Sequence, residues 1–132
     1  MSKAEEEFVA AAINDNGEPV IVFALEWCEF CWSVKKLFKK LEVPYRSVDL
    51  DSVEFQEGQR GRAIRDVLQE QTSFETIPQI FIGGEFVGGC TDVFDGWNEG
   101  QVQRLLDDAG VKYNRAVAVD PYSFLPQWLH PR

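Results

Sequence analysis

The stretch Val20–Cys31, VIVFALEWCEFC, decides the fold of this chain. It begins as an apolar, β-branched run, passes through a short polar break, and ends in two cysteines with two residues between them. After Cys31 the apolar residues recur at helical spacing, at Val34, Leu37, Phe38 and Leu41. The pattern predicts a buried strand that leads into a helix, with Cys28 at the junction.

The position of Cys28 suggests redox chemistry. A helix N-terminus carries unpaired N–H groups and a partial positive charge, which together stabilise a thiolate. Glu26 and Glu29 place negative charge beside this thiol and oppose part of that effect. A second cysteine pair would indicate zinc, but the chain has none, and its single histidine, His130, is distant. We therefore expect a redox dithiol and no metal site.

Size and composition set further bounds. The 132 residues suit one domain with its own core, and 45% of them are hydrophobic, as is usual for globular proteins. No apolar run approaches the ~20 residues that span a bilayer. A net charge of −9 disfavours nucleic acid and anionic membranes as partners. The first residues lack the pattern of a secretory signal, so we expect a cytoplasmic protein.

Periodicity and turn signals predict the remaining elements. Helices are expected over residues 3–14, from Cys28 to about 41, over 62–72 and over 102–109; strands over 45–50, 78–82 and 85–87. A further helix should open after Gly88-Gly89, with Thr91 or Asp92 as its cap. Residues 113–132, rich in proline and aromatic rings near their end, predict an extended segment that packs on the domain or on a partner.

Three segments together resemble one known family. They are Cys28–Cys31 (CEFC), Thr76–Gly84 (TIPQIFIGG) and Gly88–Asp92 (GGCTD). In their order and spacing they are similar to glutaredoxins, members of the thioredoxin superfamily, over about residues 18–110. The resemblance implies a thioredoxin fold, in which a four-stranded mixed sheet is flanked by helices. This chain would add an N-terminal helix within a domain at 1–112, and a C-terminal extension at 113–132.

The resemblance also implies an activity, glutathione-dependent thiol–disulfide exchange. Cys28 would attack a protein disulfide or a glutathione mixed disulfide, and Cys31 would be the resolving thiol. Glutathione would be the co-substrate, and disulfide-containing or glutathionylated proteins would be the partners. A thioredoxin-type protein served by a flavoprotein reductase is the less favoured alternative, because the Gly88–Asp92 loop is of the glutaredoxin kind.

Glutaredoxins bind glutathione in a groove beside the dithiol. By resemblance, Pro78 would be cis, and the backbone of Ile77 would pair with the cysteinyl unit of glutathione. The γ-glutamyl end would meet residues Gly89, Cys90, Thr91 and Asp92, the carboxylate of Asp92 pairing with the amine. We expect Cys90 to be a small buried residue and not a third catalytic thiol.

The chain also departs from the family pattern. Leu25 replaces a common lysine that contacts the glycyl carboxylate of glutathione, and Glu29-Phe30 replaces Pro-Tyr. Phe30 keeps the aromatic ring without the hydroxyl, and by the resemblance it would contact glutathione. Arg65 aligns with a glutathione-contacting glutamine and could supply the missing cation. Equally, Arg65 could be a solvated helix residue paired with Asp66 or Glu70.

The absence of proline after Cys28 leaves a second hypothesis open. Some glutaredoxins without this proline hold a [2Fe–2S] cluster between two subunits, using the first cysteine of each and two glutathiones. By this resemblance the chain could be a cluster carrier or sensor, with Cys28 as its iron ligand. A dimer is expected in that case, and a monomer otherwise.

Overall fold

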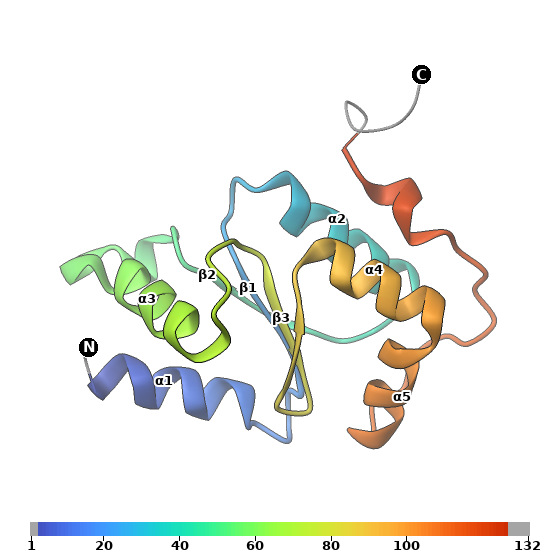
Figure 1. Ribbon diagram of the computed structural model, residues 1–132, viewed down its shortest axis with the longest axis horizontal. Helices are drawn as coiled ribbons and strands as arrows, with labels where there is room; N and C mark the ends of the chain where they lie inside the picture. The colour runs from blue at the N-terminus through green and yellow to red at the C-terminus, as the bar shows by residue number, and fades with distance from the viewer. Residues whose placement is uncertain (1–2, 127–132) are drawn as a thin grey trace.

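The computed structural model of the protein describes residues 3–126 (Figure 1). Its helices and strands are α1 (Lys3–Ile13), β1 (Val20–Ala24), α2 (Glu29–Lys40), β2 (Arg46–Asp49), α3 (Arg60–Thr72), β3 (Gln79–Ile82), β4 (Glu85–Gly88), α4 (Cys90–Glu99) and α5 (Gln101–Asp108). Three short 3₁₀ turns complete the list: η1 (Val53–Phe55), η2 (Glu57–Gln59) and η3 (Pro121–Phe124). His130 lies outside the described residues.

The four strands form one mixed sheet in the order β2-β1-β3-β4. β1 pairs in parallel with β2 and antiparallel with β3, and β3 pairs antiparallel with β4. Helices α1 and α3 lie on one side of the sheet, and α2, α4 and α5 lie on the other (Figure 1). This is the thioredoxin fold that the sequence predicts, with the added N-terminal helix in place.

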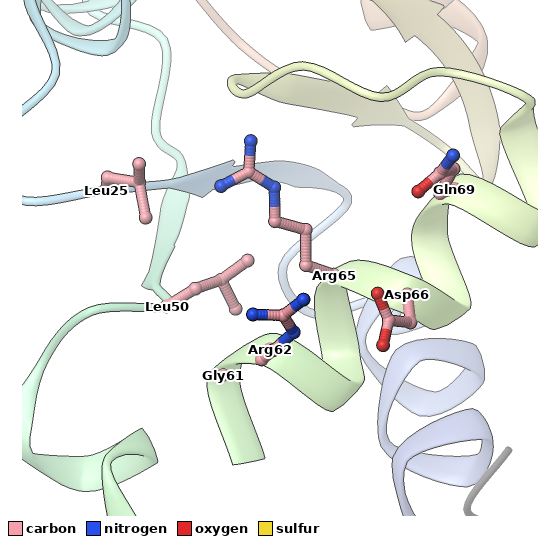
Figure 2. Close-up of a pocket in the computed structure, with 7 residues that line it drawn as sticks. All are labelled: Leu25, Leu50, Gly61, Arg62, Arg65, Asp66 and Gln69. Atoms are coloured by element: carbon pink, nitrogen blue, oxygen red, sulfur yellow. The ribbon is translucent and has the colours of Figure 1, made fainter. Parts of the chain in front are cut away.

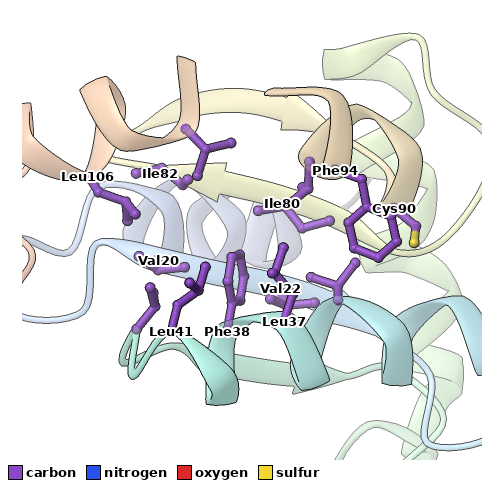
Figure 3. Packing of buried hydrophobic residues seen from close by; sticks show 14 of the residues in the cluster. Val20, Val22, Leu37, Phe38, Leu41, Ile80, Ile82, Cys90, Phe94 and Leu106 are labelled. Atoms are coloured by element: carbon purple, nitrogen blue, oxygen red, sulfur yellow. The ribbon is translucent and has the colours of Figure 1, made fainter. Parts of the chain in front are cut away.

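The sheet is buried on both faces, which explains why β1 is apolar throughout and does not alternate. Val20 and Val22 face α2 and α4, whereas Ile21 and Phe23 face α1 and α3. Figure 3 shows the first of these clusters, where side chains of α2 such as Phe38 meet those of β1 and β3. The apolar clusters on the two faces of the sheet fix the position of the end of β1, and with it the position of Cys28.

One boundary differs from the prediction. The fourth predicted helix, α4, has Gly89 as its cap residue, so the expectation that Thr91 or Asp92 caps it is wrong. Asp92 lies one turn inside and accepts a hydrogen bond from the Gly89 N–H at 2.9 Å. A glycine has no side chain to act as a cap, and the Asp92 side chain compensates by reaching back. Between β2 and α3, the polar and acidic residues 51–61 predict a loop or a loose helical turn, and the structure has the short turns η1 and η2 there.

The segment that follows α5 lies against α2 and α4. The Asn114 N–H donates to the Leu41 carbonyl at 2.7 Å, and Pro121 is buried. The Tyr122 ring packs edge-to-face on Phe94 with centroids 5.4 Å apart. Residues 113–126 therefore extend the apolar cluster on this side, while residues 127–132 lie outside the described part. In that described part, no helix is long and apolar enough to cross a membrane.

Candidate functional site

Cys28 caps the N-terminus of α2. Its backbone is extended, with φ −146° and ψ 111°, and its Sγ accepts the Cys31 N–H at 3.3 Å. The local cause is in the sequence: the apolar strand ends at Ala24, and α2 begins at Glu29 with its own apolar stripe directed to the core. The thiol therefore occupies the end of a helix where N–H groups are available to a sulfur anion.

Cys31 lies one turn further along α2 and is fully buried, whereas Cys28 is partly exposed. Burial raises the pKa of the Cys31 thiol well above its ordinary value, and the hydrogen bond with Cys28 adds to the rise. Cys31 is therefore a protonated thiol at neutral pH. The two sulfurs are unequal, with one accessible and the other enclosed.

The Ile77–Pro78 peptide bond is cis, as the family resemblance implies. It brings the Ile77 carbonyl to 3.9 Å from the Cys28 Sγ, across a sequence separation of 49 residues. The backbone of Ile77 thus borders the reactive thiol.

A groove of about 310 Å³ extends from this point toward α4. It is lined by Phe30, Phe74, Thr76, Ile77, Pro78, Gly89, Cys90, Thr91 and Asp92. Seven of the eight residues proposed from the sequence to bind glutathione are among them. Phe74 and Thr76 were missed. Thr76 belongs to the quoted Thr-Ile-Pro segment and could have been included, whereas Phe74 lies outside every recognised motif.

At the α4 end of the groove the backbone is shaped by glycine. Gly88 has φ +128°, and a Cβ there would lie 2.4 Å from the Asp92 Oδ2. Only glycine lets the Asp92 carboxylate fold back onto the Gly89 N–H. The first turn of α4, including Thr91, thus faces the groove with its N–H groups and one carboxylate.

Cys90 also lines the groove but is 6% exposed. Burial, with a smaller contribution from the charge of Cys28, raises the pKa of the Cys90 thiol to about 12. A thiol that stays protonated is a poor nucleophile. The geometry agrees with the expectation of a small buried residue.

Arg65 lies elsewhere. It lines a neighbouring hollow of about 470 Å³, together with Leu25, Leu50, Gly61, Arg62, Asp66 and Gln69 (Figure 2). Its guanidinium projects from α3 toward Leu25 and donates to the Glu75 carbonyl at 3.4 Å. Within residues 3–126 no ion pair links Arg65 to Asp66 or Glu70. The cation and the position of the missing lysine therefore share one hollow, which is distinct from the groove.

The surroundings of Cys28 include two exposed indoles that the sequence analysis did not single out. Trp27 is 82% exposed and Trp32 is 38% exposed. A tryptophan directly before a reactive cysteine was a signal available in the sequence. Across residues 3–126, no three His, Cys, Asp or Glu side chains gather as a metal site.

Comparisons with known proteins agree with this geometry. The glutaredoxin family model matches residues 20–87. Two relatives are monothiol glutaredoxin-S12, chloroplastic, of Arabidopsis thaliana, with 37% identity over 81% of this chain, and glutaredoxin-C6 of Oryza sativa, with 34% identity over 83%. The matched region covers 56% of the first relative and 88% of the second. The chain thus spans little more than half the length of the Arabidopsis protein.

Two solved structures are also similar. A buckwheat glutaredoxin–glutathione complex has a TM-score of 0.69 and 32% identity, covering 83% of this chain and 97% of the other. The holo form of glutaredoxin C1 from Populus tremula x tremuloides has a TM-score of 0.71 and 30% identity, covering 81% and 99%.

Proposed function

The chain belongs to the glutaredoxin family, and from that premise we propose that it is a glutathione-dependent thiol–disulfide oxidoreductase. Its substrates would be glutathione mixed disulfides and, more slowly, protein disulfides. The observation that carries the proposal is the position of the Cys28 Sγ, partly exposed at the start of α2 and 3.9 Å from the Ile77 carbonyl at one end of the groove.

The groove suits glutathione because its polar groups match those of the tripeptide in type and in their sequence along the groove. The backbone of Ile77 offers strand-like hydrogen bonds to the cysteinyl unit, next to the Cys28 sulfur. At the other end, the N–H groups of the first α4 turn suit the γ-glutamyl carboxylate, and Asp92 suits its ammonium. The buckwheat glutaredoxin, similar in fold, was solved as a glutathione complex.

The proposed monothiol route has two steps. The Cys28 thiolate attacks the glutathione sulfur of a mixed disulfide; that S–S bond breaks, and the substrate thiolate leaves and takes a proton from water. A second glutathione, as thiolate, then attacks the glutathionyl sulfur on Cys28. Oxidised glutathione forms, and the electron pair returns to Cys28. In the net reaction the sulfur of one free glutathione is oxidised into the new disulfide, and the sulfur of the substrate is reduced to a thiol.

The dithiol route needs Cys31, and the burial of Cys31 slows it. Attack requires a thiolate, and the raised pKa of Cys31 keeps that fraction small at neutral pH. Desolvation, the largest cause of the raised Cys31 pKa, comes from the burial of the thiol in the core. We therefore propose that glutathionylated substrates are the preferred class.

The test is a pair of assays on three proteins. Cys31→Ser should keep reduction of a glutathione mixed disulfide and lose reduction of a protein disulfide, whereas Cys28→Ser should lose both. A Cys28→Ser variant that keeps mixed-disulfide reduction would contradict the proposal, as would a wild-type protein with no glutathione-dependent activity.

A second candidate is a glutathione-ligated [2Fe–2S] carrier or sensor. The holo form of the Populus relative and the residue after Cys28, Glu29 in place of proline, favour testing it. Only Cys28 is an accessible thiol in the described chain, since Cys31 and Cys90 are buried. One chain would thus supply one iron ligand, and a second copy with two glutathiones would complete the set. Anaerobic reconstitution that produces both visible absorbance and a dimer on gel filtration would support this candidate; a colourless monomer would rule it out.

A further inference from the structure

An aromatic and acidic surface lies directly beside Cys28. We define this acidic–aromatic patch by Glu26, Trp27, Glu29, Trp32 and Asp51. Trp27 and Trp32 are two of the three large apolar side chains exposed in the described chain, at 82% and 38%. Indole rings exposed to water beside a reactive atom are energetically unfavourable, which makes the patch a candidate interaction surface.

Three contacts hold the patch in shape. The two indoles meet edge-to-face with their centroids 6.1 Å apart. The Trp32 Nε1–H donates to the Glu26 carbonyl at 2.9 Å, and the Glu26 N–H donates to the Asp51 Oδ1 at 2.7 Å. These bonds tie the loop that carries Trp27 to both α2 and the end of β2. The Trp27 ring is thus presented to solvent on an ordered backbone.

The charge around the indoles is mainly negative. The carboxylates of Glu26, Glu29 and Asp51 belong to the patch itself. Of the lysines on α2 nearest to it, Lys35 is already paired with Asp49 at 3.2 Å, and Lys36 is exposed one turn after Trp32. The whole chain carries −9, so long-range attraction also favours a cationic partner.

The patch and the groove lie on opposite sides of Cys28. The groove is lined mainly by the segment that leads into β3 and by the start of α4, whereas Asp51 follows β2. β1, which leads to Cys28, lies between β2 and β3. No patch residue lines the groove. A glutathionylated substrate has a glutathionyl half and a protein half. When the glutathionyl half fills the groove, the protein half lies outside the groove, on the side of Cys28 where the patch is.

We propose that the acidic–aromatic patch binds the protein half of a glutathionylated substrate, and that it selects cysteines flanked by arginine or lysine. A guanidinium over an indole face gains cation–π attraction, and neighbouring carboxylates add to it. This inference rests on the proposed function and specifies its substrate class. The covalent step is the one already given: Cys28 attacks the glutathione sulfur, and the patch orients the protein thiolate that leaves.

The test compares two glutathionylated peptides with one central cysteine, flanked by arginines in one and by glutamates in the other. At low ionic strength the wild type should favour the basic peptide by about tenfold in kcat/KM, from one exposed cation–π contact and one exposed ion pair. The preference should decline as added salt shortens the Debye length.

Variants locate the effect. Trp27→Ala and Glu26→Gln should each reduce the preference about threefold, since each removes one of these contacts. Glu26→Lys should reduce it further and speed the acidic peptide. The matched control Glu70→Gln removes an exposed charge on α3 and should leave the preference unchanged. Turnover of the small cysteine–glutathione mixed disulfide, which cannot reach the patch, should be unchanged in Trp27→Ala and Glu70→Gln. The Glu26 variants also change the charge beside Cys28, so they are judged by the ratio of the two peptide rates, in which an effect on the thiol itself cancels.

If the wild-type protein were active but turned over the two peptides at equal rates, the proposed role of the patch would be overturned, and the proposed function would stand. Loss of preference in Glu70→Gln as large as in Glu26→Gln would also overturn it. If the protein were inactive toward the small mixed disulfide, the proposed function would fail. The role of the patch would then be tested separately, by measuring how peptides bind. In that measurement, a serine-containing basic peptide should change the tryptophan fluorescence and its acidic counterpart should not; equal responses would refute the patch.

Discussion

Replacing Asp92 separates two roles of one carboxylate. Its Oδ2 accepts the Gly89 N–H at 2.9 Å and so completes the start of α4. In the proposed function, its charge also pairs with the ammonium of glutathione. Asp92→Asn keeps a carbonyl oxygen in the same place but removes the charge, whereas Asp92→Ala removes both.

The structure sets the size of each effect. Asp92 is exposed, so an ion pair with glutathione is worth ~0.2–1 kcal/mol, and its loss should raise KM up to about fivefold in both variants. Loss of the negative charge at the helix start should lower stability by ~0.3–1 kcal/mol in both. Only Asp92→Ala also leaves the buried Gly89 N–H without its partner, a further ~1–3 kcal/mol.

Two measurements suffice: KM for glutathione in the mixed-disulfide assay, and thermal unfolding followed by circular dichroism. Each kcal/mol should appear as about 3–5 °C in Tm for a chain of this size. Asp92→Asn should therefore bind glutathione as weakly as Asp92→Ala while melting several degrees higher. Glu99→Gln, which removes an exposed acid at the C-terminal end of α4, is the control: it should leave KM unchanged and should raise Tm slightly instead of lowering it.

The reasoning would be refuted by either of two results. An unchanged KM in Asp92→Asn would show that the charge does not meet glutathione. Equal Tm values for Asp92→Asn and Asp92→Ala would show that the hydrogen bond to Gly89 does not stabilise α4.

Three further predictions follow from other parts of the chain. Arg65→Ala should raise KM for glutathione several-fold, and the exposed Arg104→Ala on α5 should not; an unchanged KM would remove Arg65 from the binding site. Because burial raises the pKa of Cys90 from 9.0 to about 12, stability should fall between these pH values, where only the unfolded thiol ionises. Cys90→Ala should therefore flatten the loss measured by urea unfolding by up to ~1.4 kcal/mol per pH unit, and an unaltered slope would contradict the burial argument. Tyr122→Phe, which loses only the hydrogen bond to Asp95, should lower stability by ~0.5 kcal/mol, and Tyr122→Ala by ~2 kcal/mol or more. Wild-type stability in Tyr122→Ala would show that residues 113–126 do not pack on α4.

The fold was predictable because its signals are local. An apolar run buried on both faces, as in β1, differs from a one-sided strand in the sequence itself, and the stripe on α2 has a helical period. The hairpin at Gly83-Gly84 is likewise a property of adjacent residues. Family resemblance then ordered these elements into a sheet.

The α4 cap was less predictable. Thr91 and Asp92 are good caps by residue type, yet the cap is Gly89, two or three residues earlier, and the helix starts at Cys90. The start of α4 depends on where β4 ends, so residue type alone places that start up to one helical turn too late. Arg65 depends on the fold in another way, since only the direction of α3 determines that its side chain lines the same hollow as Leu25.

By itself the sequence determined that Cys28 follows a buried strand and begins a helix, because both patterns are written in neighbouring residues. Only the tertiary structure decided that Cys31 is enclosed, that Ile77 and the start of α4 meet beside Cys28, and that Phe74 joins them. Burial and convergence depend on contacts between segments tens of residues apart, and those contacts follow from how the two faces of the sheet are packed. The reactive sulfur could therefore be identified in the sequence, while its groove and the enclosure of Cys31 required the fold.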